Sequence, residues 1–248
     1  MKLFKLLALI VLLFATGSSH SQEVEKEERV PGHYNNNPFK QLYEEFSTPN
    51  QYRSASGAPG PAYYQQQADY VMDIELDDKN KKLMGYETIT YTNNSPDVLD
   101  YLWVQLDQNM RARDSKTPLI QSSGAAPADM AGNFVNQYMG QGFDGGFNIQ
   151  EVKDTNGKNL EYTINRTMMR IELPKSMTTG DQFEFSIRWW YNINDHVNKR
   201  GRSGYEEFED GNRAYVIAQF FPRMAVYNDV EGWQNSQFWG RDEFALVF

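Results

Sequence analysis

Apolar and polar residues alternate along the segment QFEFSIRWWYNI, which begins at Gln182. Successive side chains of a β-strand point to opposite faces, so every second residue shares a face. One face of this segment would carry Phe183, Phe185, Ile187 and Trp189. The opposite face would carry Glu184, Ser186 and Arg188. A period of two with one apolar face predicts a half-buried strand.

Other segments also have a residue pattern typical of β-strands, and turn residues separate them. They cover residues 68–78, 83–92, 98–109, 147–154, 160–167, 168–174 and 213–221. Asn156-Gly157, between two of these segments, is a strong signal for a hairpin turn. Aromatic residues make up 14% of the chain, which favours β structure because rings pack well on pleated surfaces. The pattern predicts an all-β fold of antiparallel sheets or a β-sandwich, with almost no helix.

The first 21 residues have the features of a secretion signal. Lys2 and Lys5 are positively charged, and residues 6–14 form an apolar run that small residues follow. We expect cleavage before Gln22. A membrane anchor is the alternative, but this run is too short to cross a bilayer. The chain has no cysteine, so it forms no disulfides and carries no lipid on a thiol. These features predict a secreted or periplasmic protein of a bacterial envelope, with no membrane span after signal cleavage.

Two regions lack the residue pattern of β-strands and are rich in polar or small residues. Residues 22–67 are interpreted as a polar arm or linker with one short helix near 40–46, and simple disorder is the alternative. Residues 115–146 form a long loop, and loops of this length are usually functional or disordered. The expected organisation is a signal peptide at 1–21, the arm at 22–67 and one β domain at 68–248.

The charge of the chain excludes one class of partner. The formal net charge is −9, whereas a nucleic-acid-binding surface must be basic. The basic run at 198–202 is short and is followed by the acidic residues 206–210, so a solvated loop is expected there. No nucleic acid is expected as a partner.

The sequence contains no self-contained active site. A zinc hydrolase needs closely spaced ligands, as in HExxH, but His20, His33 and His196 are far apart in the chain. A cysteine nucleophile is excluded, and no serine lies in a G-x-S-x-G turn. The glycines at 139–146 are interpreted as a flexible loop, because no lysine accompanies them as in a phosphate-binding loop. We therefore expect no catalytic residue and no metal ligand in this chain.

Three segments in order carry a resemblance to a known family. The first, at 70–109, contains Gly85, Ile89, Tyr91 and Asn93 in a G-x-x-x-I-x-Y-x-N pattern. The second is QFEFSIRWWYNIND, and the third is AYVIAQFFPRMAVYNDVEGW, at 214–233. Together they resemble the saddle-like N-terminal β domain of aminopeptidase N-like zinc metallopeptidases, in the form found in secreted bacterial members. The resemblance covers residues 67–248.

The resemblance implies a chain that ends inside this β domain. The apolar run 244–248 would then be an interrupted strand, and the zinc-binding catalytic domain with its HExxH motif would follow it. On this hypothesis the chain alone has no cofactor and is inactive, and zinc belongs to the absent domain. Its partners would be that catalytic domain and a peptide substrate. The resemblance also suggests Gln219 for binding the free amine of the substrate; the alternative is that Gln219 is an ordinary strand residue. Arg223 is the second candidate substrate-binding residue and would pair with a carboxylate, structural or not.

A second hypothesis comes from a different functional class. The chain would be a stand-alone secreted β-sandwich module that binds a glycan or a protein. Its ligand would contact exposed aromatic residues, namely Trp103, Trp190, Trp233 and Trp239. The opposing consideration is that aromatic residues on alternating strands more often belong to a core.

Overall fold

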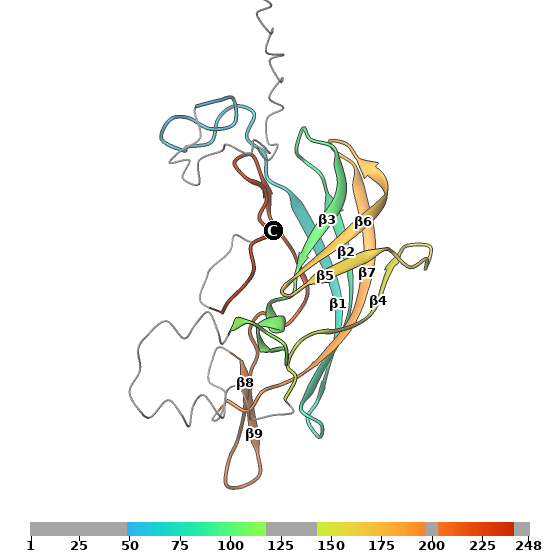
Figure 1. The fold of residues 1–248 in the computed structure, drawn as a ribbon, viewed down its shortest axis with the longest axis vertical. Coiled ribbons are helices and arrows are strands. Elements are labelled where there is room, and N and C mark those ends of the chain that lie inside the picture. The colour runs from blue at the N-terminus through green and yellow to red at the C-terminus, as the bar shows by residue number, and fades with distance from the viewer. Residues whose placement is uncertain (1–48, 118–142, 197–202, 241–248) are drawn as a thin grey trace, which may run out of the picture. The chain divides into compact units, whose positions relative to one another are not determined.

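The structure is a computed structural model that describes residues 49–117, 143–196 and 203–240 (Figure 1). All of these residues belong to one compact unit, Pro31–Phe248, and the other unit, Met1–Val30, is not described. Several sequence predictions therefore lie outside the described residues. These are the signal peptide, the helix at 40–46, most of the loop 115–146, the basic run and the terminal apolar run.

Strands dominate the described residues, which confirms the predicted all-β fold. Every pair of strands is antiparallel. The strands are β1 (Gln67–Asp77), β2 (Lys82–Thr92), β3 (Leu99–Gln105), β4 (Asn148–Asp154), β5 (Tyr162–Asn165), β6 (Met168–Met177), β7 (Gln182–Asn192), β8 (Gly204–Glu207), β9 (Arg213–Val216), β10 (Arg223–Met224), β11 (Tyr227–Asn228) and β12 (Gly232–Trp233). A short 3-10 helix, η1 (Asp107–Arg111), follows β3.

The first four-stranded sheet has the order β1-β2-β7-β4. All residues of β2 pair with β1 on one side and with β7 on the other. The alternation along β7 determines which face is buried: Phe185, Ile187 and Trp189 are buried as predicted, whereas Phe183 is half-buried. The second sheet has the order β10-β3-β6-β5, and two hairpins, β8-β9 and β11-β12, complete the fold.

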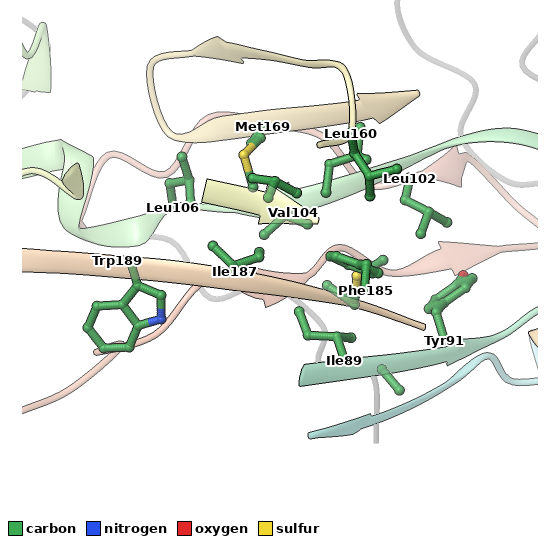
Figure 2. Packing of buried hydrophobic residues seen from close by; sticks show 14 of the residues in the cluster. Ile89, Tyr91, Leu102, Val104, Leu106, Leu160, Met169, Phe185, Ile187 and Trp189 are labelled. Carbon is green, nitrogen blue, oxygen red and sulfur yellow. The ribbon is translucent and has the colours of Figure 1, made fainter. Parts of the chain in front are cut away.

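Both four-stranded sheets contribute to one hydrophobic core (Figure 2). From the first sheet, Ile89 and Ile187 are fully buried, and from the second sheet Leu102 and Val104 are fully buried. Figure 2 shows these side chains between the strands, with Met169 on the opposite side of Val104 from Ile187. Because apolar faces of two sheets meet in one cluster, the observed arrangement is that of the predicted β-sandwich.

Gly85 makes room for the largest ring of this core. A Cβ atom at this position would lie only 2.3 Å from Cζ2 of Trp189, its cross-strand neighbour in β7. Trp189 is itself 1% exposed, so its ring has little freedom to move away. The glycine of the G-x-x-x-I-x-Y-x-N pattern is therefore required by packing.

We predict that Gly85→Ala lowers the free energy of unfolding by about 2–3 kcal/mol, because overpacking displaces a buried ring. Urea unfolding of the full chain measures this. Thr88→Ala, on the outer face of the same strand, is the control and should cost clearly less. Adding Trp189→Phe to Gly85→Ala should cost less than the sum of the two single changes, because the smaller ring leaves room for the methyl group. Equal losses for Gly85→Ala and Thr88→Ala would contradict this explanation.

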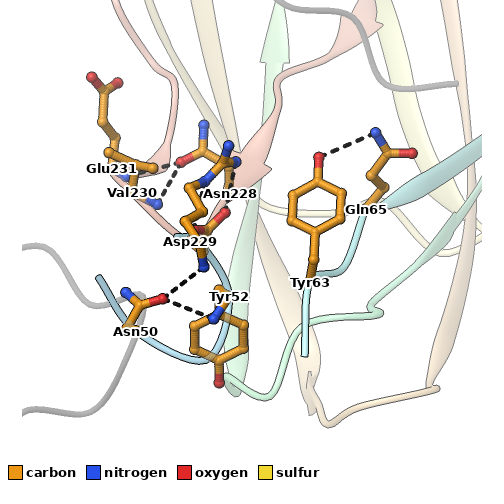
Figure 3. A network of polar contacts seen from close by, with 9 residues as sticks. Asn50, Tyr52, Tyr63, Gln65, Asn228, Asp229, Val230 and Glu231 are labelled. Atoms are coloured by element: carbon orange, nitrogen blue, oxygen red, sulfur yellow. Dashed lines mark hydrogen bonds and ion pairs between the residues drawn. The ribbon is translucent and has the colours of Figure 1, made fainter. Parts of the chain in front are cut away.

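The described end of the predicted arm, residues 49–66, is attached to the β11-β12 hairpin. The guanidinium of Arg53 donates to both carboxylate oxygens of Asp229, at 2.7 and 2.8 Å. Asn50 accepts from the backbone N–H groups of Tyr52 and Arg53, and Tyr52 is buried (Figure 3). This part of the arm therefore belongs to the packed domain.

Two predicted strands end earlier than expected. The segment 98–109 is extended only to Gln105, after which the chain turns into η1. The segment 213–221 is extended only to Val216. Gln219 has a φ of 52°, a left-handed conformation that does not continue a strand, and Pro222 follows three residues later.

Candidate functional site

The two predicted site residues lie on or beside the bend between β9 and β10. Gln219 is in the bend, outside any strand, and its side chain is half-buried. The side-chain amide of Gln108 donates to the backbone carbonyls of Ala218 and Gln219, at 2.9 and 3.1 Å. Gln108 is 1% exposed, and its own carbonyl accepts from Arg111 at 3.2 Å. The 3-10 helix η1 therefore holds the bend in its left-handed conformation.

Arg223, at the end of this bend, forms a buried ion pair with Asp107. Its Nε donates to Oδ2 of Asp107 at 2.9 Å, and the two side chains are 9% and 1% exposed. Burial raises the pKa of the Asp107 carboxyl, and the Arg223 guanidinium offsets part of this rise. Oδ1 of Asp107 and Nη1 of Arg223 are buried without a hydrogen-bond partner among the described residues. The pair therefore has unused polar atoms inside the domain.

Tyr70 connects this region to the first sheet. Its hydroxyl accepts a hydrogen bond from the backbone N–H of Met224 at 2.9 Å, and its ring packs edge-on against Phe221. Burial raises the pKa of the Tyr70 hydroxyl, which stays protonated at neutral pH. Residues of β10 thus contact both β1 and η1.

Glu87 is a second buried carboxyl group, and it was not among the residues predicted from the sequence. It lies on the inner face of β2, is fully buried, and is flanked across the ladder by Met72 and Ile187. Neither carboxylate oxygen has a hydrogen-bond partner among the described residues. Desolvation raises the pKa of Glu87 well above its usual value. One feature of the sequence could have indicated Glu87: it is an acidic residue at an inward-facing position of an alternating strand, between Gly85 and Ile89.

The described part of this region offers buried polar atoms rather than a cluster of metal ligands. Among the described residues, no group of three or more His, Cys, Asp and Glu side chains is placed to hold a metal ion. His196 follows β7, and its backbone N–H donates to the carbonyl of Tyr205 in β8. Arg223 pairs with Asp107, and its role in substrate binding stays a prediction. No hydrogen bond of the Gln219 side chain to another residue of 49–117, 143–196 or 203–240 indicates a role for its carboxamide.

The four tryptophans of the binding-module hypothesis are all half-buried. Trp233 packs against the rings of Tyr91 and Tyr227. Lys82 lies over Trp190, with its Nζ 4.2 Å from the ring centroid. The structure therefore does not present these rings together as one exposed platform.

The described part of the chain contains no helix that is long and apolar enough to cross a membrane.

Comparisons with known proteins give a likeness of structure only. No family model matches the chain, and no curated protein matches it. An M1 zinc metallopeptidase from Deinococcus radiodurans is similar with a TM-score of 0.33 and 12% identity, over 61% of this chain and 28% of that chain. A two-domain M1 zinc metallopeptidase mutant bound to L-tryptophan gives a TM-score of 0.33 and 10% identity over the same shares. No activity follows from a likeness at this level.

Proposed function

We propose that this chain is the non-catalytic N-terminal β domain of a secreted zinc metallo-aminopeptidase-like protein. In the complete protein it would line the substrate cleft of a catalytic domain that carries the zinc. One observation carries the proposal: the three segments of the family resemblance, distant in sequence, are neighbours in one sandwich. The first supplies most of β1 and all of β2 and β3, the second supplies all of β7, and the third supplies β10 next to β3.

The bend at Gln219 is the part of this domain that would contact substrate. A carboxamide oxygen can accept a hydrogen bond from the free ammonium group of a peptide, and such charge-assisted bonds are strong. Gln108 and the Arg223–Asp107 pair would hold the bend in position without touching the substrate. The peptide and the catalytic domain would be the partners of this chain.

The reading frame beyond the codon for Phe248 tests the proposal directly. An open frame that continues into HExxH, with a glutamate about twenty residues further on, is the expected result. A stop codon immediately after Phe248 would overturn the proposal. In that case the stand-alone binding module becomes the better hypothesis.

We predict that the full 248-residue chain by itself neither binds zinc tightly nor hydrolyses aminoacyl substrates. The chain has no HExxH, and its histidines are too dispersed to form a site. Titration calorimetry with zinc and release of a chromogenic aminoacyl group measure the two properties. Chelator-sensitive hydrolysis by the purified chain would contradict the non-catalytic role.

We predict that Gln219→Gly in the complete protein raises KM for peptides about tenfold, because one hydrogen bond to an ammonium group is lost. Glycine accepts the positive φ of this position, so the bend itself should persist. Gln150→Gly, on the edge strand β4, controls for loss of a glutamine elsewhere. An unchanged KM with an unchanged melting temperature would remove Gln219 from the substrate site.

A further inference from the structure

β1 is an eleven-residue strand at one edge of the first four-stranded sheet. All eleven residues pair with β2, and no strand pairs with the other side of β1 among residues 49–117, 143–196 and 203–240. An unpaired edge presents a row of free backbone N–H and C=O groups. Such a row can accept a further strand from another chain.

The second half of β1 is exposed on both faces. Ile74 and Leu76 point to the inner face, yet they are 43% and 42% exposed. Asp73 and Glu75, on the outer face, are exposed and form no ion pair with any described residue. The edge therefore alternates between an apolar side chain on one face and a carboxylate on the other.

A shallow groove continues from these carboxylates across the outer face of the sheet. It has a volume of about 430 Å³, and six of the residues that line it are Asp73, Glu75, Tyr86, Gln150, Arg188 and Trp190. The positive charge of Arg188 is compensated, because its Nε lies 3.0 Å from Oε1 of Glu151. Long side chains of an added strand can extend into this groove.

The charge of β1 decides between two kinds of occupant. Its outer face carries four carboxylates, Asp69, Asp73, Glu75 and Asp77, and the strand contains no basic residue. Pairing β1 with β1 of a second copy would bring like charges face to face, which is destabilising. A strand with basic side chains on its outer face would instead form opposite-charge pairs with the same residues.

We propose that β1 binds an extended segment of a partner in which apolar and basic residues alternate. The apolar residues of that segment would cover Ile74 and Leu76, and its basic residues would face Asp73 and Glu75. This inference does not depend on the function proposed above, because it concerns a different surface from the bend at Gln219. It assigns to the domain a docking edge with a defined sequence preference.

Blocked octapeptides test the preference against the full chain. TKVKVKVT places its lysines on one face of a strand and its valines on the other. TKKKVVVT has the same composition without the alternation, and TEVEVEVT has the opposite charge. We expect calorimetry to detect binding of TKVKVKVT and at least tenfold weaker binding of the other two. Hydrogen exchange of the β1 amides should slow only with TKVKVKVT.

A charge reversal on the strand provides the matched test. The double variant Asp73→Lys, Glu75→Lys should no longer bind TKVKVKVT and should bind TEVEVEVT instead. Its melting temperature should be unchanged. Glu206→Lys, an exposed carboxylate on the β8-β9 hairpin, should behave like the parent chain. Equal binding of TKVKVKVT and TKKKVVVT would overturn the proposal in favour of charge attraction alone. Absence of binding, or a dimer that the double variant abolishes, would also overturn it.

Discussion

Glu87→Met should make the domain markedly more stable at neutral pH. A fully buried carboxyl without a partner must either stay protonated or carry an uncompensated charge. The unfolded chain ionises this group near the ordinary glutamate pKa of 4.5, whereas burial raises the pKa in the folded state. Each pH unit between these two pKa values costs about 1.4 kcal/mol of stability. We expect a gain of about 1–3 kcal/mol at pH 7, the usual cost of burying a polar group without a hydrogen bond.

The pH dependence separates the charge effect from packing. Because the folded pKa of Glu87 is raised, its contribution is complete below about pH 4.5 and is lost as the pH rises toward the folded pKa. Glu87→Gln keeps the shape but cannot ionise, so its advantage over the parent should be small at pH 4 and should grow toward pH 8. Urea unfolding across this range measures both variants.

Glu206→Gln is the control, because that carboxylate is exposed. Its pH profile should follow that of the parent chain. If the Glu87→Gln profile also ran parallel to the parent, Glu87 would not be the buried acid that limits stability at neutral pH.

Arg223→Met should have the opposite effect, a loss of about 3–5 kcal/mol at pH 7, because it leaves Asp107 buried and unpaired. Without the guanidinium the pKa of Asp107 should rise further, since burial alone already raises it. The deficit should therefore shrink as the pH falls and Asp107 is protonated. Urea unfolding at pH 7 and at pH 4 measures the change.

The double variant Arg223→Met, Asp107→Leu should recover much of this loss, because both charges are then replaced by apolar groups. Arg213→Met, which removes pairs with Glu207 and Asp78 at the surface, should cost clearly less, because exposed pairs contribute little. Full stability of Arg223→Met alone would mean that the pair does not hold the bend, and Arg223 would then be available for another role.

The alternation of residue types predicted the sheets well, because burial on one face imposes a period of two. Phe185, Ile187 and Trp189 are buried as that period requires. The same rule does not fix where a strand ends. The backbone of Gln219 turns because Gln108, 111 residues earlier in the chain, binds its carbonyl. The residues next to Gln219 in the sequence do not indicate such a long-range contact.

The candidate site was predictable only in part, for a related reason. Arg223 was expected to pair with a carboxylate, but the chain offers 33 acidic residues, and only the fold selects Asp107. The alternation of residues along β2 already places the acidic residue Glu87 on the inner face of the strand. Whether such a residue finds a partner depends on the opposite sheet, which the sequence of β2 does not specify.

The strand order β1-β2-β7-β4 has a consequence for biosynthesis. β7 is made after β4 but lies between β2 and β4, and 90 residues separate Thr92 from Gln182 where β2 and β7 pair. Until β7 leaves the ribosome, β2 has an unpaired edge that can join another nascent chain. Closing so distant a contact is also slow. The yield of folded protein in a cell should therefore depend on how long the emerging chain is shielded by chaperones before β7 arrives.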